Sequence, residues 1–258
     1  MPPRHAKCIN TIAENYKSNS QKARILTENW VKANMFCPRC GNLKIEQFSN
    51  NKPVADFYCA SCESQFELKS KSGELGDRIN DGAYNTMISR INGNSNPDFF
   101  FLSYMQKEQK VNSFVVIPKH FFVPDIIEKR KPLSETARRS GWVGCNIILN
   151  TIPSQGRIFV VWNGIVKNKE NVIAELNRSC ALEMRDIASR GWLFDVLNCV
   201  NNISNFEFTL DNVYEFEHIL SERHPDNNNV KAKIRQQLQF LRDKGYIEFL
   251  TRGRYRKI

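Results

Sequence analysis

Two acidic residues and a lysine lie close together on one short stretch of the chain, residues 53–69. Asp56 precedes a Cys-x-x-Cys pair, and Glu67 and Lys69 follow it. Two neighbouring carboxylates repel each other unless a cation or a proton lies between them. Oxygen ligation with open positions suits hydrated Mg²⁺ better than zinc. An ion held by Asp56 and Glu67 against a phosphate, with Lys69 beside the nucleophile, predicts metal-dependent phosphodiester hydrolysis.

The same stretch has the pattern of a β-hairpin. Residues 54–58 and 65–69 are rich in aromatic and aliphatic side chains, and the small residues between them suit a turn. Asp56 is then expected diagonally across from Glu67, at roughly 7–8 Å. Because side chains alternate along a strand, Glu67 and Lys69 share one face and Leu68 points to the other. The alternative is a surface hairpin whose acids and lysine form only salt bridges.

Four cysteines form two Cys-x-x-Cys pairs, Cys37 with Cys40 and Cys59 with Cys62, separated by 18 residues. This spacing is typical of a structural zinc site. With four protein ligands the ion has no open position for chemistry, so its expected role is to hold the hairpin in register. A redox pair or a chance spacing is the alternative. The remaining cysteines are expected to be packing residues: Cys8, Cys145, Cys180 and Cys199.

The composition predicts a globular protein with a polyanionic partner. The 258 residues carry a formal net charge of +10, and 41% are hydrophobic. This length is enough for one large domain or two. A strongly basic balance favours nucleic acid as a partner, although a basic protein without such a partner is the alternative. No apolar run reaches membrane-spanning length and the first residues lack a signal core, so we expect an intracellular protein.

The order of expected elements suits an α/β sandwich. Residues 19–34 are expected to form an amphipathic helix, and residues 70–92 a second helix that ends at Gly93. Glu28, on the first helix, is either a further acid of the metal site or a solvated surface residue. Strands are expected at 98–105, buried beside a parallel neighbour, and at 111–118, 146–149 and 157–162. Residues 167–185 form a last helix or a linker.

A basic segment at residues 128–142 carries two clusters of cationic side chains, the second of which is Arg138 and Arg139. We expect a mobile loop that contacts phosphates or a groove, with Trp142 as a stacking or wedging ring. The alternative is a solvated loop with a core tryptophan.

The pattern changes beyond residue 190. Three helices are expected, at 193–200, 210–220 and 230–244, and Gly245 follows the third in a C-cap position. A hairpin completes the chain. This is the order of a winged helix, whose third helix enters the major groove while the hairpin contacts the backbone.

Charge supports that orientation. Residues 231–258 carry nine lysines and arginines against two acids, whereas residues 190–230 are acidic. An amide side chain is able to bridge the major-groove edge of adenine. An exposed polar helix, or a winged helix for protein contacts, is the alternative. The candidate DNA-contacting residues are Lys233, Gln236, Gln237, Arg252 and Arg254.

The acids and the lysine resemble the PD-(D/E)xK nuclease motif, with Asp56 as first acid, Glu67 as second and Lys69 as the lysine. The usual Pro-Asp pair is loosened to Pro53-Val-Ala-Asp56. Further segments extend the resemblance over nearly the whole chain to the DpnI-like family of methyl-directed type II restriction endonucleases. These segments are 16–27, 66–71, 80–84, 136–142, 234–238 and 241–245.

The resemblance implies an enzyme that cuts GATC in double-stranded DNA when the adenine is N6-methylated. It implies a PD-(D/E)xK domain with zinc at residues 1–184 and a winged helix at 185–258 that binds the methylated site independently. We expect a Mg²⁺-dependent monomer in the bacterial cytoplasm. A methyl group in the major groove calls for an apolar or aromatic contact, and Trp142 and Trp192 are candidates. For Trp192 the alternative is core packing of the first C-terminal helix. A non-catalytic DNA-binding regulator and a repair nuclease are the other functional hypotheses.

Overall fold

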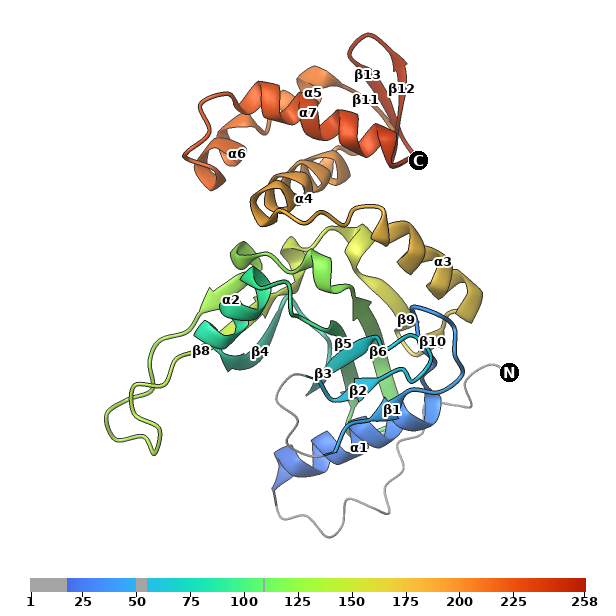
Figure 1. Ribbon diagram of the computed structural model, residues 1–258, viewed down its shortest axis with the longest axis vertical. Coiled ribbons are helices and arrows are strands. Elements are labelled where there is room, and N and C mark those ends of the chain that lie inside the picture. The colour runs from blue at the N-terminus through green and yellow to red at the C-terminus, as the bar shows by residue number, and fades with distance from the viewer. Residues whose placement is uncertain (1–17, 50–54, 109) are drawn as a thin grey trace.

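The computed structural model describes residues 18–49, 55–108 and 110–258 of the chain. Figure 1 shows a larger part built around a central sheet and a smaller part that holds the C-terminal helices and hairpin. Helix α4 (Ile187–Asn202) lies between the two parts. The residues expected at the start of the hairpin, Pro53 and Val54, lie outside the described residues, as does Cys8.

The central sheet has seven strands in the order β1-β2-β3-β5-β6-β9-β10. Strands β3 and β5 are parallel along their whole length, and the other neighbours are antiparallel. The expectation that residues 98–105 form a strand beside a parallel neighbour is therefore confirmed. The strands are β1 (Glu46–Gln47), β2 (Phe57–Tyr58), β3 (Gln65–Ser72), β5 (Asp98–Met105), β6 (Lys110–Ile117), β9 (Ile158–Trp162) and β10 (Ile165–Val166).

Strand β5 is apolar on both faces because both faces of the sheet are covered. Phe99 and Phe101 belong to one buried cluster, whereas Phe100 and Leu102 belong to another, as the alternation of side chains requires. Helices α1 (Asn19–Asn34) and α3 (Lys169–Cys180) contribute to the second cluster. Helices α2 (Tyr84–Asn92) and α4 contribute to the first. The result is the α/β sandwich that the order of elements predicts.

The expected helix at 70–92 is wrong for its first half. Strand β3 continues to Ser72, which pairs with Tyr104 of β5, and β4 (Arg78–Ala83) precedes the helix α2. Gly73 and Gly76 have φ values of +82° and +64°, which end the strand and exclude a continuous helix. Strand β4 pairs with β8 (Gly144–Ile148), and β8 pairs with β7 (Ile127–Lys129), so a second sheet covers the central one.

The C-terminal part has the expected winged-helix order with two additions. The expected helix at 210–220 is two short helices, and a three-residue strand β11 precedes them. The third helix ends as predicted, since Gly245 has a φ of +72° and the N–H of Tyr246 bonds the carbonyl of Leu241. The elements are β11 (Glu207–Thr209), α5 (Leu210–Tyr214), α6 (Glu217–Arg223), α7 (Val230–Asp243), β12 (Ile247–Thr251) and β13 (Arg254–Lys257).

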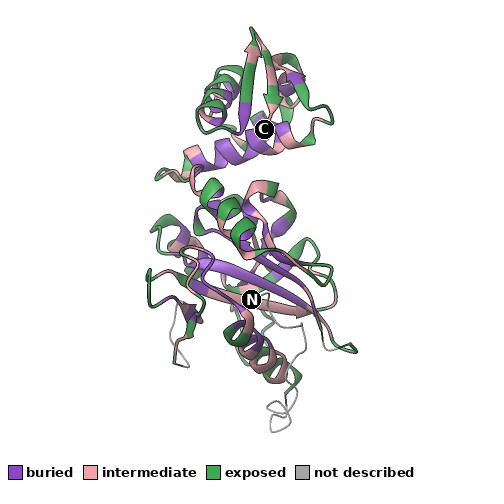
Figure 2. Cartoon of the chain, turned by 90° about the vertical axis from the view of Figure 1, so that its right-hand side faces the viewer, coloured by how far each residue is buried: buried purple, intermediate pink, exposed green. Residues whose placement is uncertain are grey.

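Helix α4 is buried along most of its length because it packs against both parts of the molecule (Figure 2). Trp192 is 6% exposed and stacks on His224 with 3.9 Å between ring centroids. It is therefore a core residue and is not available to a methyl group on DNA. Across the described ranges, none of the helices combines the length and the apolar composition needed to cross a membrane.

Candidate active site and metal centre

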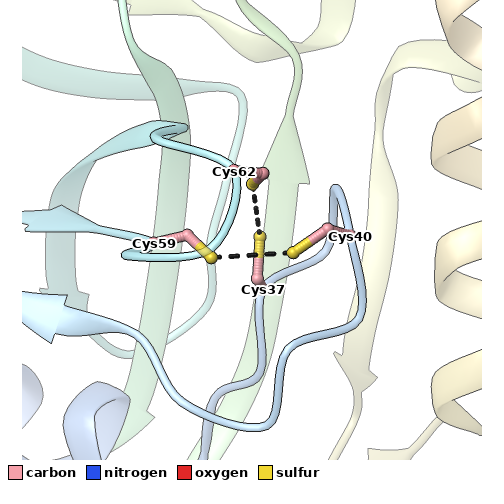
Figure 3. Close-up of side chains that lie close together, drawn as sticks. All are labelled: Cys37, Cys40, Cys59 and Cys62. Carbon is pink, nitrogen blue, oxygen red and sulfur yellow. Dashed lines mark hydrogen bonds between the residues drawn. The ribbon is translucent and has the colours of Figure 1, made fainter.

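The four cysteines of the two pairs converge on one point (Figure 3). Their sulfur atoms all lie within 4.8 Å of one another, and the closest contacts, at 3.6 Å, join Cys37 to Cys62 and Cys40 to Cys59. These contacts cross between the pairs and exceed disulfide length, and all four cysteines are free thiols in this arrangement. A tetrahedron with metal–sulfur bonds of about 2.3 Å has edges of about 3.8 Å. The thiolates therefore fit a zinc ion.

Both cysteine pairs lie on the same kind of backbone turn. The N–H of Gly41 bonds the carbonyl of Cys37, and the N–H of Glu63 bonds the carbonyl of Cys59, each at 2.8 Å. Gly41 and Glu63 both adopt positive φ, at +77° and +59°. Although burial acts to raise it, hydrogen bonds with Ser64 lower the pKa of Cys62 to about 7, which favours the thiolate.

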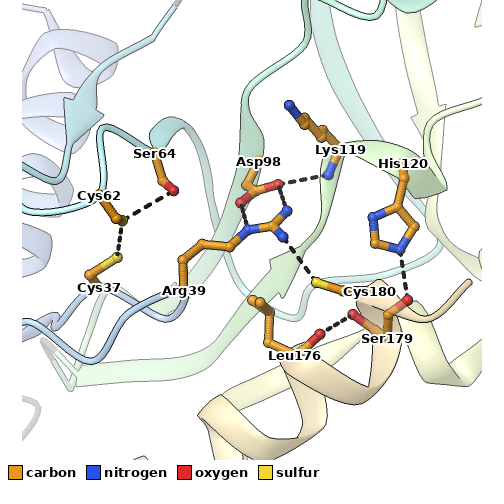
Figure 4. Close-up of polar contacts among 10 residues, drawn as sticks. All are labelled: Cys37, Arg39, Cys62, Ser64, Asp98, Lys119, His120, Leu176, Ser179 and Cys180. Atoms are coloured by element: carbon orange, nitrogen blue, oxygen red, sulfur yellow. Dashed lines mark hydrogen bonds and ion pairs between the residues drawn. The ribbon is translucent and has the colours of Figure 1, made fainter. Parts of the chain in front are cut away.

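Arg39 fastens the first cysteine turn to the central sheet (Figure 4). Its guanidinium donates two hydrogen bonds of 2.7 Å to the carboxylate of Asp98, and a third bond reaches the sulfur of Cys180. Asp98 is 3% exposed and begins β5, the parallel neighbour of β3. The cysteine cluster is thereby tied to β5, the strand that lies beside Glu67 and Lys69.

Glu67 and Lys69 lie side by side on β3, as the alternation of the strand predicts. The ammonium of Lys69 is 2.6 Å from the Glu67 carboxylate and also pairs with Asp81 of β4. Burial acts to lower the pKa of Lys69, but Glu67 and Asp81 outweigh it and raise that pKa above its usual value. Lys69 therefore remains a cation at neutral pH. Sequence reasoning missed Asp81 because its segment was expected to be helical.

The second oxygen of Glu67 is also occupied. It accepts a hydrogen bond of 2.8 Å from Arg90 on α2, another contact that the sequence pattern did not indicate. Both oxygens of this carboxylate are thus neutralised by cations from the protein. A metal ion at Glu67 would therefore share these oxygens with Lys69 and Arg90 or displace one of the two.

The pairing of β2 with β3 ends one residue short of Asp56, so the position of Asp56 diagonally across from Glu67 stays a prediction. The last paired residues are Phe57 and Phe66, and the N–H of Asp56 bonds the carbonyl of Phe66. The Asp56 carboxylate accepts a bond of 2.7 Å from the N–H of Leu68. Burial raises the pKa of Asp56 although this bond acts against it, and the negative charge of Glu28 raises it further.

Glu28 is buried, so the expectation that it is a solvated surface residue is wrong. The residue is 7% exposed, and its carboxylate is held by Arg24 at 2.5 Å and by the amide of Gln47 at 2.8 Å. Arg24 also lies 4.0 Å from Asp56. Arg24 thus contacts both carboxylates, and helix α1 places Glu28 near Asp56.

The acids fit a hard divalent cation by their chemistry, since they offer carboxylate oxygens in a partly buried, charge-balanced region. They are less closely gathered than the cysteines: among the described residues, only the four cysteines form a cluster of at least three ligating groups within 4.8 Å.

The basic segment forms an extension of the β7–β8 hairpin, which projects from the larger part in Figure 1. Backbone bonds join Leu133 to Trp142 and Arg130 to Gly144. Arg138 and Arg139 are exposed, and the Arg139 guanidinium lies 4.3 Å from the ring centroid of Trp142. Trp142 is half-buried against the backbone of Gly144, so it is neither a core residue nor a free ring.

Most of the predicted DNA-contacting residues of the C-terminal part are accessible. Arg252 and Arg254 are exposed at the tip of the β12–β13 hairpin, Gln236 is exposed on α7, and Lys233 is half-buried. The prediction for Gln237 is wrong, because this side chain is 3% exposed on the face of α7 that packs into the core. It is not available to a base edge.

Two family models match the chain. The model of the Dam-replacing family, DpnI, matches residues 6–185, and the model of the Dam-replacing helix-turn-helix domain matches residues 188–257. The two matches are separated by residues 186–187, at the start of α4. Together with the central sheet, the cysteine cluster and the C-terminal helices, they show that the chain belongs to the Dam-replacing (DpnI) family of methyl-directed restriction endonucleases.

Proposed function

We propose that the protein is a type II restriction endonuclease that cleaves double-stranded DNA at GATC sites carrying N6-methyladenine. The family membership supports methyl-directed cleavage. The observation that carries the catalytic part is the contact of Glu67 with Lys69 on β3, with Asp56 hydrogen-bonded to the same strand at Phe66 and Leu68. We further propose residues 1–184 as the nuclease domain and 185–258 as a winged helix, in a monomer that acts in the bacterial cytoplasm.

In this proposal Asp56 and Glu67 hold Mg²⁺, with Glu28 close enough to assist. The ion supplies Lewis-acid stabilisation of the phosphate and a water of lowered pKa. Lys69 remains charged and lies beside Glu67, so it stabilises negative charge that develops on the scissile phosphate. Asp81 holds the ammonium in that position. The four cysteines hold Zn²⁺ as a structural ion, which fixes the turn between β2 and β3.

The two DNA-contacting surfaces have separate tasks in this proposal. Arg252, Arg254 and Lys233 contact phosphates, and Gln236 contacts a base edge from α7. Arg138 and Arg139 contact phosphates from the extended β7–β8 hairpin. Trp142, half-buried beside Arg139, supplies the aromatic contact to a methyl group in the major groove.

A plasmid digest tests the proposal. Plasmid DNA from cells with and without adenine methylation is incubated with the protein and Mg²⁺. We expect fragments that end within GATC sites from the methylated plasmid and no cleavage of the unmethylated one. Binding without cleavage of either plasmid would indicate the alternative, a non-catalytic regulator with a zinc module and a winged helix. Cleavage governed by DNA structure and independent of methylation would indicate a repair nuclease.

A further inference from the structure

A cavity of about 600 Å³ lies where the C-terminal part, from residue 185 onwards, joins the larger part of the molecule. These two parts are called the winged-helix part and the nuclease part, respectively. Its wall combines the α2–β5 connection, the short helical turn Lys119–Phe121, the α3–α4 connection and the first turn of α4. The volume is in the range of small-molecule sites, about 300–1,000 Å³. The cavity is formed by elements other than those that carry Asp56, Glu67 and Lys69.

Arg190 lines this cavity and is a buried cation without a carboxylate partner. The residue is 3% exposed, and its guanidinium donates to the carbonyl of His120 at 3.3 Å and to the amide oxygen of Asn94 at 3.0 Å. Its Nε has no partner, and none of the described residues forms an ion pair with it. Burial lowers the pKa of Arg190, although Glu183 and Asp186 act against this. An uncompensated buried charge is costly, which points to a missing anion.

Two more buried side chains in the cavity wall have unused hydrogen-bonding atoms. Asn96 is 6% exposed, and neither atom of its amide has a partner. His120 is 1% exposed, and its Nε2 lies 3.0 Å from the carbonyl of Ser179 (Figure 4). A carbonyl only accepts, so Nε2 carries the proton and Nδ1 is an acceptor, which also has no partner. Burial lowers the pKa of His120 to about 4, so the ring is neutral.

The rest of the charge around the cavity is mainly positive. Lys119 and Arg185 are exposed cations at its wall, and Glu183 is the acid among the lining residues. Ordered waters would satisfy the amide and the imidazole, but they would leave the charge of Arg190 uncompensated. Arginine with lysine is the usual recognition set for phosphate. A hydrogen-bond donor on the ligand would satisfy Nδ1 of His120, and a donor and an acceptor on the ligand would satisfy the amide of Asn96.

We propose that this cavity binds a small phosphate monoester of nucleotide size, with its phosphate at Arg190, Lys119 and Arg185 and its polar body at Asn96 and His120. The ligand bridges the nuclease part and the winged-helix part at the point where they join. The inference is independent of the proposed nuclease chemistry, because it uses none of the same residues.

Calorimetric titration of the full-length protein tests this inference, with 5′-AMP, adenosine and inorganic phosphate as probes. We expect AMP to bind more tightly than phosphate, and adenosine to show no binding at the same concentrations. Lys119→Gln and Arg185→Gln are each expected to weaken AMP binding about tenfold or more, since each removes a charged contact. The matched control is Lys107→Gln, an exposed lysine at the opposite end of the β5–β6 hairpin, which should leave the affinity unchanged.

Asn96→Leu tests the interior of the cavity without changing charge. Replacing a buried amide that has no partner by an apolar side chain of similar shape should not lower the melting temperature. The variant should bind AMP more weakly and phosphate as well as the wild type does. The inference is overturned if AMP does not bind at millimolar concentration or binds no more tightly than phosphate. It is also overturned if Lys107→Gln weakens AMP binding as much as Lys119→Gln and Arg185→Gln do. Displacement of AMP by a duplex without terminal phosphates also overturns it, because the occupant would then be a phosphodiester of DNA.

Discussion

Lys69 of β3 forms an ion pair with Asp81 of β4 and so links the central sheet to the second sheet. The side chains are 19% and 4% exposed, and the Asp81 carboxylate depends on Lys69 for compensation, whereas Lys69 also pairs with Glu67. The pair fixes the direction of the lysine, which is the cationic member of the proposed catalytic set. Position and charge of Lys69 therefore depend on a residue outside the nuclease motif.

Asp81→Asn should destabilise the protein by about 2 kcal/mol, because it removes one of the two carboxylates that pair with Lys69. It should also lower the pKa of Lys69, since the Asp81 carboxylate helps to raise it. Urea unfolding measures the first effect, and Asp77→Asn, at an exposed carboxylate nearby in the chain, is the control. Equal stability of the two variants would contradict the structural role of Asp81.

Asp56→Asn should make the protein more stable at neutral pH. The pKa of Asp56 is higher in the folded state than in the unfolded state. The Asp56 carboxyl group therefore contributes fully to the free energy of unfolding only below its unfolded pKa, and this contribution is lost as pH rises through its folded pKa. Asparagine keeps the acceptor for the Leu68 N–H without the charge. Urea unfolding from about pH 3 to pH 8 should show an advantage of the variant that grows with pH. A difference in stability between the variant and the wild type that does not change with pH would contradict the raised pKa of Asp56.

Cys62→Ser should release the metal and lower the stability of the nuclease part by about 3 kcal/mol or more, because binding of a structural metal contributes directly to folding. Metal content by mass spectrometry and thermal unfolding measure the two effects. Cys199→Ala, at a buried cysteine of α4 outside the cluster, should keep the metal. Full metal content in Cys62→Ser would exclude the four-cysteine site.

Arg254→Gln should weaken DNA binding similarly for all sequences and reduce the slope of log affinity against log salt by about 1, as expected when one phosphate contact is lost. Arg254 is exposed on β13. Fluorescence anisotropy at several salt concentrations measures both quantities, with Lys107→Gln as the control. An unchanged slope would place the DNA elsewhere on the surface.

Features that depend on local spacing could be predicted from the sequence. The two Cys-x-x-Cys pairs determine their own turns, and the alternation of β3 places Glu67 beside Lys69. The buried position of Gln237 also follows from a local pattern, because residues three to four apart on α7 share a face with Ile234 and Leu241. Applied to α7, that pattern excludes Gln237 as a base contact.

Features that depend on contacts between distant segments could not be predicted. Residues 78–83 contain the apolar spacing of a helix but pair with β8, more than sixty residues later in the chain. Glu28 is polar and lies on an amphipathic helix, so only the packing of α1 against the hairpin reveals its burial. Asp81 and Arg90 enter the site through the same long-range packing.

The most direct test of the central claim is single-turnover cleavage of a methylated GATC duplex by Asp56→Ala and Lys69→Ala, with DNA binding measured on the same preparations. The account predicts that both variants bind the duplex with wild-type affinity and cleave it about a thousandfold more slowly or not at all. Glu74→Ala, at an exposed carboxylate that follows β3, should cleave normally. Cleavage at the wild-type rate by either Asp56→Ala or Lys69→Ala would contradict the assignment of the active site.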